Sequence, residues 1–181
     1  MNQDFAAESD VYKKYIREIP DFPKPGISFK DIAPLLQDGS VFRKVVTRIA
    51  AAVTEMGLEP AVVACPEARG FIFGSALAFQ LGTGFVPIRK PGKLPFQTTG
   101  VEYKLEYGTD RVEMHVDAVQ PGMPVLLVDD LLATGGTIGA CAELIRQSEG
   151  NLIGTAFLVE LTFLGGRERL AGGPSFSLIK Y

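Results

Sequence analysis

Residues 125–140, VLLVDDLLATGGTIGA, combine an apolar run, two adjacent aspartates and a loop of small residues. The apolar run predicts a buried strand, and in an open α/β sheet ligands bind at the carboxyl ends of the strands. The small residues stand directly before a predicted helix, where backbone N–H groups can turn inward and the helix N-terminus adds positive potential. This order of features predicts a loop that binds a phosphate group.

Asp129 and Asp130 stand at the end of the predicted strand. Two neighbouring carboxylates repel each other and resist burial, so they need a cation or hydroxyl donors as partners. Together with the phosphate loop, they indicate a sugar-phosphate site; the alternative is a surface Asp-Asp turn before an ordinary glycine-rich helix start. No lysine follows the glycines as in a P-loop, and no G-x-G-x-x-G opens a helix after a strand, which disfavours nucleoside triphosphate and dinucleotide sites.

The rest of the chain predicts an α/β fold with a parallel sheet, because helices alternate with short apolar strands. Ser40 is the expected N-cap of the second helix, and Pro20 the expected end of the first. Alternating apolar and polar residues over 99–119 predict a hairpin with one solvent-facing side. The expected helices are 9–19, 40–57, 70–82 and 136–148; the expected strands are 61–65, 84–90, 125–130, 152–161 and 176–181, with an extended piece at 27–36 and a loop at 165–174.

Composition narrows the classes of function. The 181 residues are 46% hydrophobic, enough for one well-buried core, so we expect a single domain over 1–181. The net charge of −3 and the absence of a basic stripe disfavour nucleic acid and membrane surfaces as partners. Only Cys65 and Cys141 are present, which fits neither a disulfide framework nor a paired-ligand zinc site. With no apolar run long enough to span a bilayer, we expect a cytoplasmic protein.

Five blocks in order along the chain carry a resemblance to a known family: PDFPKPGISFKDIAP, EARGFIFG, IRKPGKLP, LEYGTD and VLLVDDLLATGGT. The chain resembles the type I phosphoribosyltransferases, and within them the adenine-specific members, from Ile19 to Tyr181. The resemblance implies a central, mainly parallel twisted sheet flanked by helices, with a hairpin lid and an N-terminal hood. It also implies a homodimer that converts adenine and 5-phosphoribosyl pyrophosphate to AMP and pyrophosphate with Mg²⁺.

The resemblance assigns three cations to the pyrophosphate leaving group. Arg69 and Arg89 would bind pyrophosphate, and Lys93 would assist from a mobile loop, with Arg69 and Lys93 counted as catalytic. Arg69 follows the predicted strand 61–65 and Arg89 follows the apolar residues that end at Ile88, so both come off carboxyl ends of strands. The alternative for Arg89 is solvation of a strand end. The family also implies a non-proline cis peptide at Glu67–Ala68.

For the sugar, the resemblance implies that Asp129 and Asp130 engage the ribose hydroxyls, directly or through metal-bound water. No residue is predicted as a direct metal ligand. The loop that would hold the 5-phosphate consists of Ala133, Thr134, Gly135, Gly136 and Thr137.

Base recognition maps by resemblance onto GISFK. Backbone groups of Ile27 and Ser28 would read the amino edge of adenine, Phe29 would stack on the ring, and Lys30 would approach the ring or the pyrophosphate.

The hairpin contributes Glu106, with Tyr107 beside it, as the expected acid or base near adenine. The alternative for Glu106 is an ordinary solvated strand carboxylate. Closure of the segment 89–109 would keep water from the reacting sugar.

Two rival functions remain. One is a transferase for xanthine, guanine or hypoxanthine, which would share the acid pair and the phosphate loop. The other is a regulator of gene expression that binds phosphoribosyl pyrophosphate, although the piece before Pro20 is short for a winged helix and the net charge is negative. Four residues of the third helix are expected to serve packing or dimer contacts: Phe71, Phe73, Leu77 and Phe79.

Overall fold

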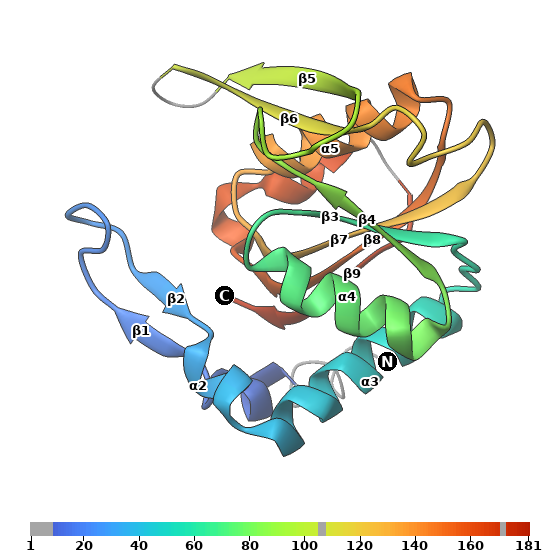
Figure 1. Cartoon of the computed structure of the whole chain (residues 1–181). Helices are drawn as coiled ribbons and strands as arrows, with labels where there is room; N and C mark the ends of the chain where they lie inside the picture. The colour runs from blue at the N-terminus through green and yellow to red at the C-terminus, as the bar shows by residue number, and fades with distance from the viewer. Residues whose placement is uncertain (1–8, 105–107, 171–172) are drawn as a thin grey trace.

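The computed structural model describes residues 9–104, 108–170 and 173–181. A five-stranded sheet in the order β4-β3-β7-β8-β9 forms its centre, and every neighbouring pair is parallel. Figure 1 shows this sheet between a helical layer with α3 and α4 and a second layer with α5 and the β5–β6 hairpin. The strands are β3 (Val62–Pro66), β4 (Gly84–Ile88), β7 (Pro124–Leu132), β8 (Asn151–Glu160) and β9 (Ser175–Lys180). The predicted parallel α/β fold is therefore confirmed.

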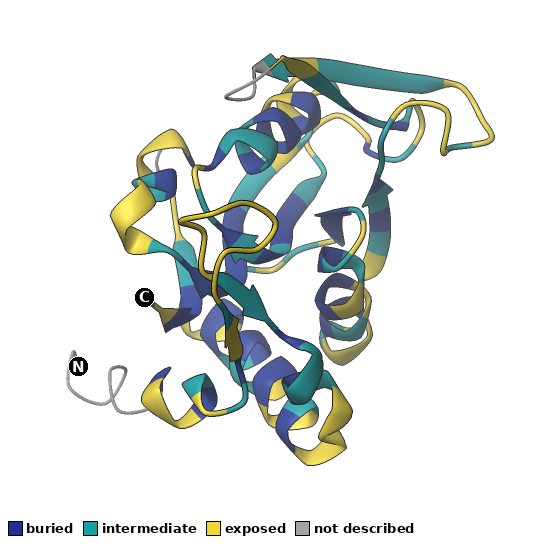
Figure 2. Cartoon of the chain, turned by 90° about the vertical axis from the view of Figure 1, so that its left-hand side faces the viewer, coloured by how far each residue is buried: buried dark blue, intermediate teal, exposed yellow. Residues whose placement is uncertain are grey.

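Both faces of the sheet are buried, which explains why its strands are almost continuously apolar. Along β7, Leu126 and Val128 pack in the core under α3 (Gly39–Glu55) and α4 (Gly70–Leu81). Val125 and Leu127 alternate with them and pack in the core under α5 (Gly136–Gln147). Figure 2 shows burial concentrated in the strands and in the helix sides that face them. The sheet thus holds β7 rigidly at the centre.

The hairpin consists of β5 (Thr98–Lys104) and β6 (Thr109–His115), paired antiparallel from Thr98 opposite His115 to Lys104 opposite Thr109. It lies over α5, and Val112 and Met114 are buried there. A bridge between Arg89 and Glu113 joins β6 to the end of β4. The predicted hairpin is confirmed, apart from 105–107, which lie outside the described residues.

The N-terminal arm, which consists of residues 9–37 before α3, differs from the sequence-based expectation. The predicted helix 9–19 was wrong beyond residue 13, because β1 (Arg17–Ile19) pairs antiparallel with β2 (Phe29–Asp31). This tertiary pairing overrides the helical periodicity of the segment. The extended piece also stops early, since α2 (Ala33–Gln37) follows β2 and Asp31 Oδ1 accepts a hydrogen bond from Ala33 N at 2.9 Å.

Short 3₁₀ turns occupy the segment between β8 and β9. They are η1 (Thr162–Leu164) and η2 (Gly166–Leu170), where the sequence predicted a loop from 165.

No helix among the described residues is both long enough and apolar enough to cross a bilayer.

The N-cap of α3 is Asp38 and not Ser40. The Asp38 carboxylate accepts hydrogen bonds from the backbone N–H groups of Ser40 at 3.0 Å and Val41 at 3.1 Å. These two N–H groups are among the four that a helix leaves without intrahelical partners at its start. The expectation for Ser40 was wrong because Asp38, two positions earlier, already supplies the acceptor.

We therefore expect Asp38→Ala to lower the free energy of unfolding by about 1 kcal/mol, the usual value of an N-cap side chain. Urea unfolding followed by circular dichroism measures this change. Ser40→Ala serves as the matched control and should leave stability within about 0.5 kcal/mol of the wild type. Equal losses in both variants would contradict the assignment of the cap.

Candidate active site

A cleft of about 320 Å³ lies at the carboxyl end of the sheet, between the residues that follow β3 and those that end β7. It brings together Arg69, both aspartates and the whole predicted phosphate loop, although Arg69 stands 60 or more positions before the others in the sequence. The lining residues are Glu67, Ala68, Arg69, Asp129, Asp130, Leu131, Leu132, Ala133, Thr134, Gly135, Gly136, Thr137 and Ile138. The sugar-phosphate part of the sequence prediction thus corresponds to one continuous surface.

The two aspartates lie inside β7, not at its end, because β7 continues to Leu132 opposite Glu160 of β8. Asp130 is only 5% exposed, and Arg69 Nε lies 2.9 Å from its Oδ2. This contact is within ion-pair distance but lacks hydrogen-bond geometry, so the described residues give Oδ2 no hydrogen-bond donor. A buried acceptor without a donor is suited to a ligand hydroxyl or a metal-bound water.

Burial and mutual repulsion govern the protonation of this pair. Burial raises the pKa of Asp129 well above its usual range, and the neighbouring Asp130 charge raises it further. Burial also raises the pKa of Asp130, while Arg69 offsets part of that effect. Positive charge that enters the cleft with a ligand would therefore stabilise the ionised pair.

The described side chains offer Mg²⁺ a partial site, not a complete cage. Within the described ranges, no three His, Cys, Asp or Glu side chains cluster as a metal cage. Mg²⁺ commonly uses one or two carboxylates together with waters and substrate phosphates, and oxygen is its preferred ligand. The acid pair, with the orphaned Oδ2 of Asp130, fits such a partial site.

The phosphate loop turns sharply at Gly135, which has φ +79° and acts as the N-cap of α5. A β-carbon at Gly135 would lie 2.6 Å from the carbonyl oxygen of Gly166, and one at Gly166 would lie 2.1 Å from that of Ala133. The η2 turn therefore packs directly against the loop backbone. Gly166 was not predicted as part of the site, because nothing local in 165–174 indicates that it touches a loop about thirty residues away.

A side-chain network holds η2 in that position. Arg167 donates to both carboxylate oxygens of Glu160 at the end of β8, to the Ser175 carbonyl at 3.1 Å and to Ser177 Oγ at 2.8 Å. Burial alone would raise the pKa of Glu160, but the hydrogen bonds from Arg167 and Ser177 lower it. The ionised Glu160 thus anchors Arg167 and, through η2, the phosphate loop.

One of the predicted pyrophosphate cations, Arg89, is held by a carboxylate that the sequence did not single out. Glu67 accepts from Arg89 Nε at 3.1 Å and Nη2 at 2.9 Å, and from the Lys90 backbone N–H at 2.6 Å. Arg89 Nη1 also donates to the Lys93 carbonyl at 3.0 Å, whereas Lys93 itself is exposed. The sequence did carry a signal for this contact. Glu67 directly follows β3 and Arg89 directly follows the neighbouring parallel strand β4, so the two residues lie side by side.

The peptide between Glu67 and Ala68 is cis, as the resemblance implied. Burial alone would raise the pKa of Glu67, but the hydrogen bonds from Lys90 N–H and Arg89 lower it, so this carboxylate is ionised at neutral pH.

The arm brings Phe29 to the site but turns Lys30 elsewhere. The Arg69 guanidinium lies 5.0 Å from the centre of the Phe29 ring. Lys30, next in the strand, is held by Glu18 at 2.8 Å and over the Tyr181 ring at 4.1 Å, with Ser28 Oγ 3.3 Å away. Successive side chains of a strand point to opposite faces, which separates Lys30 from Phe29.

The backbone groups of Ile27, predicted to read the amino edge of adenine, already have hydrogen-bond partners within the arm. The backbone N–H of Ile27 donates to the Lys24 carbonyl, and its carbonyl accepts from Phe22 N–H in the turn of the arm. Glu106 and Tyr107 lie outside the described residues.

The chain is similar in sequence to a well-defined family. A family model for the phosphoribosyl transferase domain matches residues 36–169. The chain is 55% identical over 170 residues to the adenine phosphoribosyltransferase of Desulfitobacterium hafniense, an alignment that covers 94% of this chain and 97% of the relative.

Solved structures show the same likeness. The adenine phosphoribosyltransferase of Thermoanaerobacter pseudethanolicus has a TM-score of 0.91 and 54% identity, with 95% of this chain and 99% of that chain covered. The enzyme of Saccharomyces cerevisiae, complexed with an imino-altritol bisphosphate and adenine, has a TM-score of 0.91 and 38% identity, with 96% and 99% covered.

The loop geometry leads to a testable expectation for Gly135→Ala. The positive φ and the contact with Gly166 should force the loop to shift, which should weaken binding of ribose 5-phosphate by about tenfold or more and lower the melting temperature. Calorimetric titration and thermal unfolding measure the two effects. Gly139→Ala, inside α5 with its nearest neighbouring atom 4.0 Å away, is the control and should retain both properties. Unchanged affinity in Gly135→Ala would contradict the assigned loop.

Proposed function

The chain belongs to the phosphoribosyltransferase family, and we propose that it transfers the 5-phosphoribosyl group of phosphoribosyl pyrophosphate to adenine, giving AMP and pyrophosphate. The observation that carries this proposal is the single cleft that joins a buried acid pair to a small-residue loop at a helix N-terminus. The preference for adenine is supported by two relatives named adenine phosphoribosyltransferase, each 55% identical to this chain over almost its whole length.

In this reaction the bond between ribose C1 and the pyrophosphate oxygen breaks, and its electron pair leaves with pyrophosphate. The lone pair of adenine N9 forms the new bond to C1, and the N9 proton is lost. Positive charge on the sugar and negative charge on the leaving group must both be stabilised. Asp129 and Asp130 are suited to the sugar, and Arg69 reaches the same cleft from the β3 side.

The leaving group would be bound by Arg69 and Arg89, with Lys93 assisting from the loop after β4. The planar guanidinium matches phosphate oxygens in pairs. Glu67 supports this role because it fixes the orientation of Arg89 at the end of β4. The 5-phosphate would rest against the backbone N–H groups of 133–137 and the hydroxyls of Thr134 and Thr137.

Magnesium fits as a cofactor held by Asp129 and Asp130 through water. When bound, it would neutralise charge on the pyrophosphate of the substrate.

Adenine would stack on Phe29, with backbone groups of Ile27 and Ser28 at its amino edge, whereas Lys30 is held by Glu18 on the other face of β2. The position of Phe29 against Arg69 supports stacking beside the cleft. Glu106, next to Tyr107, is the proposed acceptor of the N9 proton and rests on the resemblance alone.

The experiment that tests this function is pyrophosphate release from phosphoribosyl pyrophosphate and Mg²⁺ with adenine, hypoxanthine, guanine and xanthine in parallel. We expect turnover with adenine alone. Asp130→Asn should lower kcat/KM by on the order of 100-fold, because it removes one charge beside the developing oxocarbenium ion. Asp117→Asn, at an exposed carboxylate beyond β6, is the control and should keep the wild-type rate. Turnover with a 6-oxopurine would contradict the base assignment, and tight substrate binding without turnover would favour the regulator.

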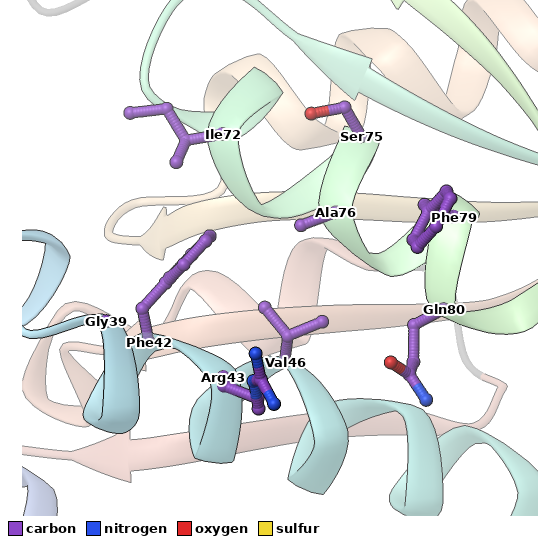
Figure 3. Close-up of a pocket in the computed structure, with 9 residues that line it drawn as sticks. All are labelled: Gly39, Phe42, Arg43, Val46, Ile72, Ser75, Ala76, Phe79 and Gln80. Carbon is purple, nitrogen blue, oxygen red and sulfur yellow. The ribbon is translucent and has the colours of Figure 1, made fainter.

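We also propose that residues 1–181 act as one domain, that the chain works as a homodimer, and that it does so in the cytoplasm. The compartment is supported by Cys65 and Cys141, which are buried free thiols. The dimer is supported by a groove of about 580 Å³ between α3 and α4. Figure 3 shows Phe42 and Val46 of α3 on one side of it and residues of α4 on the other.

The α4 side of this groove is unusually apolar for a surface. Phe79 is 88% exposed and Ile72 is 38% exposed, although Phe73 and Leu77 of the same helix are buried as packing residues. A second copy of the chain would remove this apolar surface from water. The groove holds one cation, Arg43, and no acid among its lining residues.

We therefore expect the wild-type chain to sediment as a dimer and Phe79→Glu to sediment as a monomer at micromolar concentration. Phe163→Glu, at a 72% exposed phenylalanine in η1, is the matched control and should remain dimeric. A dimeric Phe79→Glu variant would show that another face forms the interface, and a monomeric wild type would exclude the dimer.

A further inference from the structure

Three polar side chains that the mechanism above does not use, Tyr103, Asp110 and Lys90, connect the hairpin to Thr137 of the phosphate loop. Tyr103 of β5 lies with its hydroxyl 3.2 Å from Thr137 Oγ1 at the start of α5. The same hydroxyl is 3.1 Å from Asp110 Oδ2 on the paired strand β6 and 3.1 Å from Lys90 Nζ after β4. Lys90 also forms an ion pair with Asp110. One phenol oxygen is thus the meeting point of three elements.

The protons of this group can be assigned from its chemistry. Burial would lower the pKa of Lys90, but the hydrogen bonds with Asp110 and Tyr103 raise it, so Lys90 is charged and can only donate. The hydrogen bond from Lys90 lowers the pKa of Asp110, so this carboxylate only accepts. Tyr103 has one proton, which it donates to Asp110, and it accepts from Lys90. Thr137 must therefore be the donor in its contact with Tyr103.

A bound phosphate group would require the same proton. Phosphate oxygens accept hydrogen bonds, and Thr137 has a single hydroxyl proton to give. Thr137 lines the cleft as part of the loop at the N-terminus of α5. When it turns toward a phosphate, its hydrogen bond to Tyr103 is lost.

We propose that Tyr103, polarised by Asp110 and Lys90, is an internal acceptor that competes with the ligand's phosphate group for the hydroxyl of Thr137. Tyr103 is then a positioning residue that reduces the affinity of the loop and ties the hairpin to α5 while the loop is empty. This inference rests on the proposed function, because it takes 133–137 as the seat of the ribose 5-phosphate group.

The test is calorimetric titration of ribose 5-phosphate into the wild-type chain and into Tyr103→Phe, which removes only the hydroxyl. Because one hydrogen bond no longer has to be broken, we expect the dissociation constant to fall about three- to tenfold. Asp110→Asn should act in the same direction, since the weaker acceptor leaves Tyr103 free to donate to Thr137. Loss of a donor to the phosphate would instead weaken binding.

Thr137→Val provides the matched background. That variant lacks the hydroxyl for which Tyr103 and the phosphate group compete. Adding Tyr103→Phe to it should therefore leave the affinity for ribose 5-phosphate unchanged. Thermal unfolding of each variant identifies any loss of folded protein. If the wild type binds ribose 5-phosphate but Tyr103→Phe binds it equally or more weakly, the proposal for Tyr103 is overturned and the function stands. If the wild type does not bind it, the phosphate loop of the proposed function fails, and this inference fails with it.

Discussion

Two carboxylates lie inside the central strand of the sheet, and the whole site is arranged around the cost of keeping these like charges away from water. Apolar side chains bury β7 on both faces, yet Asp129 and Asp130 stand near its end. Arg69 compensates only part of that charge, and Asp130 Oδ2 has no hydrogen-bond donor among the described residues. A ligand that brings hydroxyl donors and positive charge would supply these missing partners, and its binding would therefore stabilise the folded protein.

The phosphate loop depends equally on a distant part of the chain. Gly135 and Gly166 approach so closely that neither position has room for a β-carbon. Arg167 fixes Gly166 by its hydrogen bonds to Glu160 and to the first residues of β9. The backbone N–H groups of the loop therefore have a set direction before ligand arrives, which lowers the entropy that binding must overcome.

The sequence predicted those features whose signals are local. Apolar runs predicted the five strands to within two residues, and the small residues before α5 predicted where that helix begins. Prediction failed where a contact with another part of the chain determines the local structure. β1 forms because β2 pairs with it. Asp38 caps α3 although Ser40 fits the usual N-cap pattern equally well. Glu67, Gly166 and Tyr103 were missed for the same reason, since each acts through a contact across the fold.

Three cations at and beside the site share a further property, which is that each is paired with an internal carboxylate. Arg69 pairs with Asp130, Arg89 with Glu67 and Lys90 with Asp110. In the proposed reaction, an anionic substrate that binds these three cations would replace their internal carboxylate partners, so its binding free energy would be a difference between two sets of contacts. Such exchange moderates ground-state affinity, whereas charge that develops only during bond cleavage has no internal competitor. In the proposed reaction, the same residues would therefore stabilise the transition state more than the bound substrate, which is the condition for catalysis.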